Sequence, residues 1–169
     1  MTELASEPVP DREVSMTVNG RPCRVRCEDR HLLVEVLREQ LRLKGTHAGC
    51  LNGDCGSCTV ELDGQPVKSC LVLAAAADGA EIITLEGVAQ RRELDPVQQA
   101  FWDNDGFQCG FCLPGQIFAT RWLLARDAEP ADAVIREALA GNICRCTGYQ
   151  SIVESVRAAA AGLRGEASR

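Results

Sequence analysis

The first half of the chain alternates between apolar and polar residues, which is the pattern of strands that bury one face of a sheet. Residues 13–27 (EVSMTVNGRPCRVRC) read as two such strands around Asn19-Gly20, a dipeptide that favours the tight turn of a β-hairpin. A second hairpin is predicted over residues 58–70 around an Asp-Gly turn, and residues 81–87 supply one more short strand. These segments predict a small mixed sheet.

Between the two hairpins the apolar spacing changes to that of a helix. Residues 31–43 (HLLVEVLREQLRL) direct four apolar side chains to one face, at Leu33, Val36, Leu37 and Leu41. One helix crossing a small mixed sheet is an α+β arrangement, so an α+β domain is expected here.

The second half has the 3.6-residue period of helices. Four short helices are predicted, within residues 95–106, 114–130, 131–142 and 151–165. Asp95 is a candidate N-cap for the first of them, followed by a proline at the first helical position. The apolar positions at helical spacing are Val97, Ala100, Phe101, Ile117, Phe118, Trp122, Ala125, Val134, Ile135, Ala138, Leu139, Ile152, Val153, Val156 and Ala160. Four short helices joined by short loops indicate a four-helix bundle.

A polar stretch at residues 89–95 (AQRRELD) marks the boundary between a first domain, residues 13–89, and a second, residues 90–163. Residues 1–12 and 164–169 are expected to be mobile ends. Each half has about 80 residues, a size at which a hydrophobic core alone is marginal. A metal centre in each half would supply the missing stability, because metal binding is coupled to folding.

Ten cysteines among 169 residues are the unusual feature of the composition. The N-terminus lacks a basic start followed by an apolar run, so no secretion signal is predicted, and no apolar run approaches the roughly 20 residues of a membrane span. In the reducing cytoplasm, which is the expected location, clustered cysteines indicate metal binding and not disulfides. The net charge of −6 argues against nucleic acid, which requires a basic surface.

The first cysteine group has C-x4-C-x2-C spacing and a distant fourth cysteine, as in plant-type 2Fe-2S ferredoxins. Its members are Cys50, Cys55, Cys58 and Cys70. Gly53 and Gly56 are expected to let the loop turn sharply and bring its N–H groups towards the sulfur atoms. A structural zinc site usually pairs two separate C-x2–4-C knuckles. Because the two gaps share the middle cysteine, zinc is the weaker interpretation.

The second cysteine group combines a C-x2-C pair with a C-x-C pair, each at a predicted helix junction. Its members are Cys109, Cys112, Cys144 and Cys146. Helix N-termini direct free N–H groups and a partial positive charge outward, which suits an anionic cluster. This spacing predicts a second metal centre.

Three motifs carry both groups: GCLNGDCGSCTVELDG, FQCGFCLPGQ and GNICRCTGY. In this order and spacing they resemble the small iron–sulfur subunit of the molybdenum hydroxylases, the xanthine oxidase and aerobic carbon monoxide dehydrogenase family. The resemblance implies a β-grasp, plant-type ferredoxin-like N-terminal domain and a C-terminal four-helix bundle, each holding one 2Fe-2S cluster. In that family the clusters relay single electrons from a molybdenum–pterin cofactor on a large subunit to FAD on a medium subunit.

The resemblance assigns two further roles by motif position. Gln108 corresponds to a glutamine that hydrogen-bonds the pterin in the family, and Cys146 ligates iron and also lies against that pterin. The bundle cluster is therefore expected nearer molybdenum and the plant-type cluster nearer FAD. Leu113 departs from the threonine that many relatives carry, which changes local packing and removes no ligand.

The chain is thus interpreted as the electron-transfer subunit of a cytoplasmic molybdenum hydroxylase, assembled with a large and a medium subunit as a dimer of heterotrimers. Neither a catalytic residue nor membrane insertion is expected of it. The alternatives are a free-standing two-cluster ferredoxin and a zinc-stabilised interaction module. The substrate stays open among carbon monoxide, an aldehyde, a purine or other N-heterocycle, and an aromatic acyl-CoA.

The remaining residues of these chemical types have structural interpretations. Cys23 and Cys27 have no partner pair and are expected to behave as small buried apolar residues. His47, beside the first loop, is expected to pack or to hydrogen-bond there. Trp102 and Trp122 are expected in the bundle core or at a subunit interface.

Overall fold

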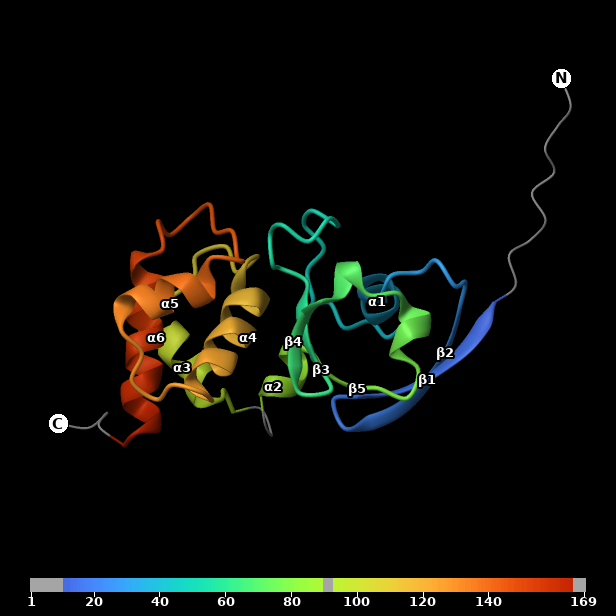
Figure 1. Ribbon diagram of the computed structural model, residues 1–169, viewed down its shortest axis with the longest axis horizontal. Coiled ribbons are helices and arrows are strands. Elements are labelled where there is room, and N and C mark those ends of the chain that lie inside the picture. Colours follow the sequence, from blue (N-terminus) through green and yellow to red (C-terminus); the bar gives the residue numbers. More distant parts are fainter. Residues whose placement is uncertain (1–10, 90–92, 166–169) are drawn as a thin grey trace, which may run out of the picture.

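The computed structural model describes residues 11–89 and 93–165. Within them the chain forms a sheet lobe and a helical lobe that lie side by side (Figure 1). The predicted mobile ends fall largely outside the described residues, as does the middle of the predicted domain boundary, residues 90–92. In the described part, no helix has both the length and the apolar character that crossing a membrane requires.

The sheet lobe is built on five strands in the order β2-β1-β5-β3-β4. They are β1 (Arg12–Val18), β2 (Arg21–Cys27), β3 (Thr59–Leu62), β4 (Gln65–Lys68) and β5 (Glu81–Ile83). β1 and β5 are parallel, whereas the other neighbours are antiparallel. Both predicted hairpins are confirmed, since β1 pairs with β2 and β3 pairs with β4. Their Asn-Gly and Asp-Gly turns have positive φ angles of 48° to 77° at both central residues, which is the backbone that a tight hairpin turn requires.

The helix predicted over residues 31–43 is shorter and less regular than expected. α1 (Leu33–Glu35) passes directly into a π-helical turn at Val36–Gln40, and Arg42 then takes a φ of 60°, which ends the helix early. Three of the four predicted apolar positions are buried and the fourth is partly buried: Leu33, Val36 and Leu37, and then Leu41. The predicted apolar face therefore packs on the sheet. The backbone of this segment is wider than an α-helix, because it continues as a π-helical turn.

The helical lobe is the predicted bundle of four helices, preceded by one short helical turn. The turn is α2 (Leu85–Val88), and the bundle comprises α3 (Pro96–Asp103), α4 (Leu113–Leu124), α5 (Asp132–Leu139) and α6 (Gln150–Leu163). Asp95 caps α3 as predicted: its carboxylate accepts from the Gln98 amide, and the Gln98 side chain accepts in return from the Asp95 amide.

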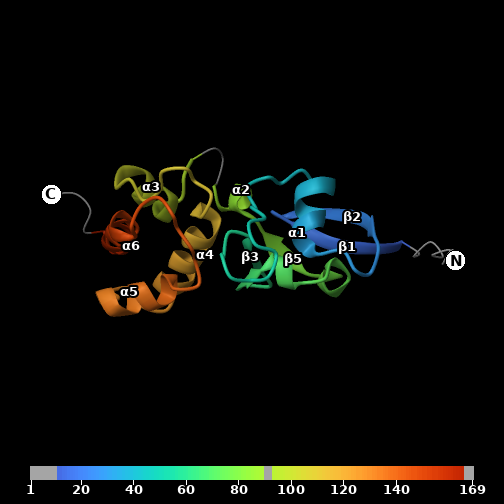
Figure 2. The same cartoon turned by 90° about the horizontal axis from the view of Figure 1, so that it is seen from above.

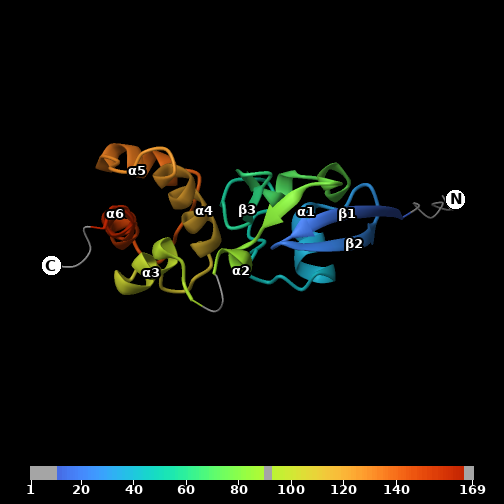
Figure 3. The same ribbon diagram turned by 90° about the horizontal axis from the view of Figure 1, so that it is seen from below.

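α4 is the helix that faces the sheet lobe, where it packs against β3 and β4 (Figures 2 and 3). The predicted apolar face of α4 is partly wrong, since Trp122 is only partly buried and Ala125 is exposed. Leu123 and Leu124 take their places in the core. A helix covered by the bundle on one side and a sheet on the other is apolar around most of its circumference, so its period does not single out one face.

Val134 is more exposed than its predicted place on the apolar face of a helix suggests, and Trp102 does not take the first of its two predicted places, the bundle core. Val134 of α5 is 39% exposed and Trp102 of α3 is 64% exposed, so Trp102 does not lie in the bundle core. Its ring lies 6.0 Å from that of Phe107, at the surface. The bundle core itself is formed by the remaining apolar positions of the four helices, with Phe101, Ile117, Ile135 and Ile152 completely buried.

Candidate metal centres

The loop between α1 and β3 carries three of the first four cysteines, and a short turn after β4 carries the fourth. We call these four residues the N-terminal quartet: Cys50, Cys55, Cys58 and Cys70. Gly53 and Gly56 have φ angles of 89° and 75°, which only glycine adopts without strain, so the loop folds back on itself as predicted.

The thiols of the N-terminal quartet are arranged as two pairs. The amide of Cys55 donates to Cys50 Sγ over 3.4 Å, and this contact with neighbouring loop amides lowers the pKa of the Cys50 thiol to about 6. Cys58 and Cys70 belong to one small buried cluster and are 2% and 3% exposed. Burial, followed by the contact with Cys58, raises the pKa of Cys70 to about 11. Amides aimed at sulfur stabilise the thiolate form that iron binds.

The loops that precede α4 and α6 carry the second group of cysteines. We call it the bundle quartet: Cys109, Cys112, Cys144 and Cys146. The Sγ atoms of Cys109 and Cys146 lie 3.5 Å apart at the surface, and Cys112 and Cys144 form a second, more buried pair. Burial, with the Cys144 contact, raises the pKa of the Cys112 thiol to about 12. The predicted helix junctions therefore bring the four thiols together.

The chemistry of both donor sets fits a 2Fe-2S cluster. Two irons bridged by sulfides require two thiolates each, and each quartet offers its thiols as two pairs. Among residues 11–89 and 93–165, no three histidine, cysteine, aspartate or glutamate side chains are grouped as the ligands of one ion would be. The backbone amides around Cys50 supply the hydrogen bonds to sulfur that such a cluster accepts. The assignment of the eight cysteines as iron ligands remains a prediction.

The two quartets are connected directly by backbone and ring contacts. The amide of Ile143, next to Cys144, donates to the carbonyl oxygen of Cys55 over 3.0 Å. His47 Nδ1 lies 2.8 Å from the carbonyl oxygen of Phe111, and the two rings stack with centroids 4.9 Å apart. His47 was predicted to pack or to hydrogen-bond near the first loop, and it does so against Phe111 of the helical lobe.

Close packing of small residues lets the two loops approach. A Cβ atom on Gly115 would lie 2.4 Å from the carbonyl oxygen of Gly56 and 2.1 Å from Oδ1 of Asn142. Asn142 itself is 6% exposed and fills the space between them. This contact between the two loops was not predicted from the sequence. The glycines beside the cysteine motifs, Gly56 and Gly115, are its local signal in the sequence.

The remaining predicted site residues lie beside the bundle quartet. Gln108 is exposed next to Cys109, and the exposed Cys146 lies against Cys109, with their Sγ atoms 3.5 Å apart. Leu113, at the start of α4, is partly buried and packs on the bundle core. The contact of Gln108 with a pterin remains a prediction.

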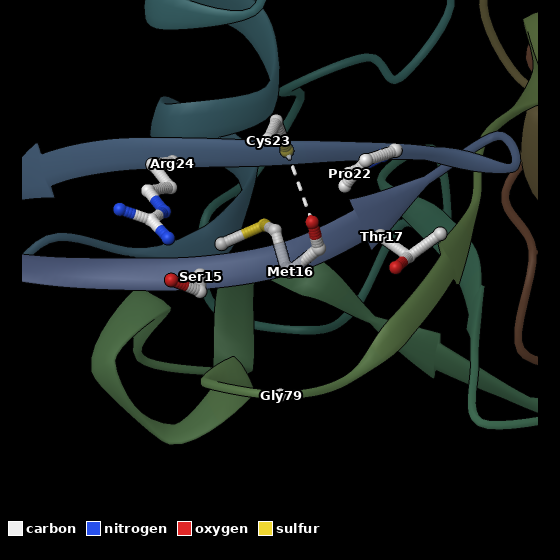
Figure 4. A pocket seen from close by; sticks show the side chains of 7 residues that line it. All are labelled: Ser15, Met16, Thr17, Pro22, Cys23, Arg24 and Gly79. Atoms are coloured by element: carbon white, nitrogen blue, oxygen red, sulfur yellow. Dashed lines mark hydrogen bonds between the residues drawn. The ribbon is translucent and has the colours of Figure 1, made fainter.

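Cys23 and Cys27 lie on the first hairpin, at the edge of the sheet far from the helical lobe (Figure 1). Cys27 is 1% exposed, as predicted for a small apolar residue. Cys23 is partly exposed and borders a surface hollow, where its thiol donates to the carbonyl oxygen of Met16 over 3.4 Å (Figure 4). Burial raises the pKa of both thiols.

Comparisons with known proteins agree with the two centres. Residues 16–85 match the family model of the 2Fe-2S iron-sulfur cluster binding domain, and residues 84–157 match that of the [2Fe-2S] binding domain. Caffeine dehydrogenase subunit gamma of Pseudomonas sp. (strain CBB1) is 45% identical over 85% of this chain and 88% of its own length. The xanthine dehydrogenase iron-sulfur-binding subunit of Escherichia coli O157:H7 is 48% identical over 85% of this chain and 91% of its own.

A solved structure extends the similarity to the whole fold. A chain of quinoline 2-oxidoreductase from Pseudomonas putida 86 superposes with a TM-score of 0.87 at 42% sequence identity, covering 92% of this chain and 98% of that chain. Two 2Fe-2S-binding domains in this order, at this identity and coverage, show the family. The chain is an iron–sulfur subunit of an oxidoreductase and belongs to the 2Fe-2S subunits of the molybdenum hydroxylase family.

Proposed function

We propose that this chain relays single electrons from a molybdenum–pterin centre on a large partner subunit, through its two 2Fe-2S clusters, to FAD on a medium partner subunit. In this proposal residues 13–89 fold around the cluster of the N-terminal quartet and residues 90–163 around that of the bundle quartet. The complete enzyme is a dimer of heterotrimers in the cytoplasm. Relatives named as subunits of caffeine and xanthine dehydrogenases support the existence of partners.

The observation that carries the proposal is the hydrogen bond from the Ile143 amide to the Cys55 carbonyl. Each cluster, when bound, accepts and releases one electron with little change in its bonds. The chain's contribution is to fix the two loops against one another, which the backbone bond and the packing of Gly56 against Gly115 accomplish. The stacked rings of His47 and Phe111 add a second contact between the two lobes.

The direction of the relay is supported by the exposure of each quartet. Cys109 and Cys146 are exposed and Gln108 lies beside them, which suits contact with a pterin on the large subunit. At the N-terminal quartet, Leu51 and Leu71 are 51% and 63% exposed. Exposed leucines beside a redox loop suit an apolar subunit interface, which we assign to the FAD subunit.

Native purification of the chain through an affinity tag tests the proposal. We expect two co-purifying proteins, one containing molybdenum and pterin and the other FAD, in equal amounts with this chain. A monomeric chain that exchanges electrons freely with unrelated reductases would instead support a free-standing ferredoxin. A colourless chain that contains zinc would contradict both.

A further inference from the structure

Lys68 brings a positive charge to the junction of the two quartets. It is one of two lysines in the chain, at the end of β4. Its ammonium donates a hydrogen bond to the carbonyl oxygen of Gly53, inside the loop of the N-terminal quartet. On its other side, a Cβ atom built on Gly141 would lie 3.7 Å from Lys68 Nζ. The ammonium therefore contacts the first loop and lies close to the segment that leads into the second.

The backbone around Lys68 belongs to the N-terminal quartet. Lys68 pairs with Thr59 across the β3–β4 ladder, and Thr59 directly follows Cys58. Cys70 lies two residues further along the chain, and Gly53 lies between the first two cysteines of the quartet. Lys68 thus lies next to backbone segments that carry the four thiols of this quartet.

The ammonium of Lys68 is bonded to a backbone carbonyl and not to a carboxylate. Among the described residues, no carboxylate forms an ion pair with Lys68. The side chain is partly buried along a hollow of about 320 Å³ that also borders Trp122 and Asn142. A partly buried charge is screened less by salt and water than an exposed one. By contrast, Lys44 is paired with Glu39 at the surface.

We propose that the positive charge of Lys68 raises the reduction potential of the N-terminal cluster. Reduction adds one negative charge to a cluster, and a fixed positive charge beside its loop stabilises that reduced form. The effect on the bundle cluster is weaker, because the hydrogen bond holds the ammonium on the N-terminal loop. Lys68 thereby favours the residence of the electron on the cluster nearer the acceptor. This inference rests on the proposed ligand assignment.

A redox titration of the cluster-loaded chain, followed by EPR with dithionite as reductant, tests the role of Lys68. In Lys68→Met and Lys68→Gln, we expect the reduction equilibrium of the N-terminal cluster to fall about tenfold, which is 59 mV for a one-electron couple. The shift of the bundle cluster should be smaller. Lys68→Arg, which keeps the charge, should restore most of the potential, and Lys44→Met should leave both clusters unchanged.

The outcomes separate the role of Lys68 from the ligand assignment. Unchanged potentials in Lys68→Met, with both signals intact, overturn the inference about Lys68 and leave the relay untouched. A wild-type potential in Lys68→Gln also overturns it, because a hydrogen bond and not the charge would then matter. Loss of the N-terminal signal in both neutral variants would make Lys68 structural, which again contradicts tuning. A wild-type chain without two signals contradicts the ligand assignment itself.

Discussion

The backbone amide of Ile143 donates a hydrogen bond to the carbonyl oxygen of Cys55 over 3.0 Å. Ile143 directly precedes Cys144 of the bundle quartet, so this single bond connects backbone that carries a cysteine of each quartet. Both groups belong to the main chain, and the contact therefore depends on how closely the two lobes approach. Gly115 controls that approach, because its missing side chain leaves room for Gly56 and Asn142.

Replacing Gly115 by alanine should separate the two loops. The new Cβ atom would lie 2.4 Å from a backbone oxygen of Gly56, which cannot rotate away as a side chain would. We expect a weaker dipolar coupling between the two reduced clusters by EPR and a loss of about 1–3 kcal/mol of folding free energy. Gly141→Ala is the matched control, since its Cβ atom would meet only Lys68 Nζ, at 3.7 Å. Equal coupling in both variants would contradict the role of Gly115.

Substitution of one cysteine in each quartet should remove one cluster at a time. Cys55→Ser is expected to abolish the EPR signal of the N-terminal cluster, and Cys144→Ser that of the bundle cluster. Each variant should lose about half of the bound iron, because each quartet holds one two-iron cluster. Cys23→Ser is the control and should retain both signals. Retention of both signals in Cys55→Ser or in Cys144→Ser would show that the ligand set is misassigned.

Two neighbouring aromatic residues of α3 should differ sharply in their contribution to stability. Phe101 is completely buried in the bundle core, and Phe101→Ala should cost about 3–5 kcal/mol through lost burial and a cavity. Trp102 is 64% exposed, and Trp102→Ala should cost less than about 1 kcal/mol. Thermal unfolding of the cluster-loaded chain, followed by circular dichroism, measures both. A larger effect at Trp102 would mean that the helix packs differently.

Gln108 should act on the molybdenum centre and not on the iron–sulfur clusters of this chain. Gln108→Ala is expected to leave both EPR signals of the isolated chain unchanged, because its side chain is exposed beside the quartet. In the assembled complex the same variant should shift the potential of molybdenum, since a hydrogen bond to the pterin would be lost. Gln99→Ala, an exposed glutamine of α3, should not. A shift that is equal in the two variants would contradict the assignment.

Local sequence signals predicted much of the fold. The turns at Asn19-Gly20 and Asp63-Gly64 and the cap at Asp95 depend on backbone preferences of a few adjacent residues, and all three are confirmed. The cysteine motifs are local signals of the same kind, because each lies in a loop at the end of a helix or strand. Cysteine spacing therefore indicated the two centres before any tertiary contact was known.

The features that sequence reasoning missed depend on contacts between distant segments. The face of α4 was misjudged at Trp122 because the helix is covered from two sides, and a hydrophobic period describes only one. The hydrogen bond between Ile143 and Cys55 joins main-chain atoms, so the identity of neither side chain indicates it in the sequence. The position of the Lys68 ammonium likewise depends on segments far from it in sequence, since it is bonded to Gly53 and lies close to Gly141.

The order of the relay is the central claim, and the magnetic coupling between molybdenum and each cluster tests it most directly. Complexes assembled with Cys55→Ser or Cys144→Ser would each contain one reduced cluster, and the splitting of the Mo(V) EPR signal would be measured in both. The account predicts the larger splitting in the Cys55→Ser complex, where only the bundle cluster remains. A larger splitting in the Cys144→Ser complex would contradict it, because the N-terminal cluster would then be the one nearer molybdenum.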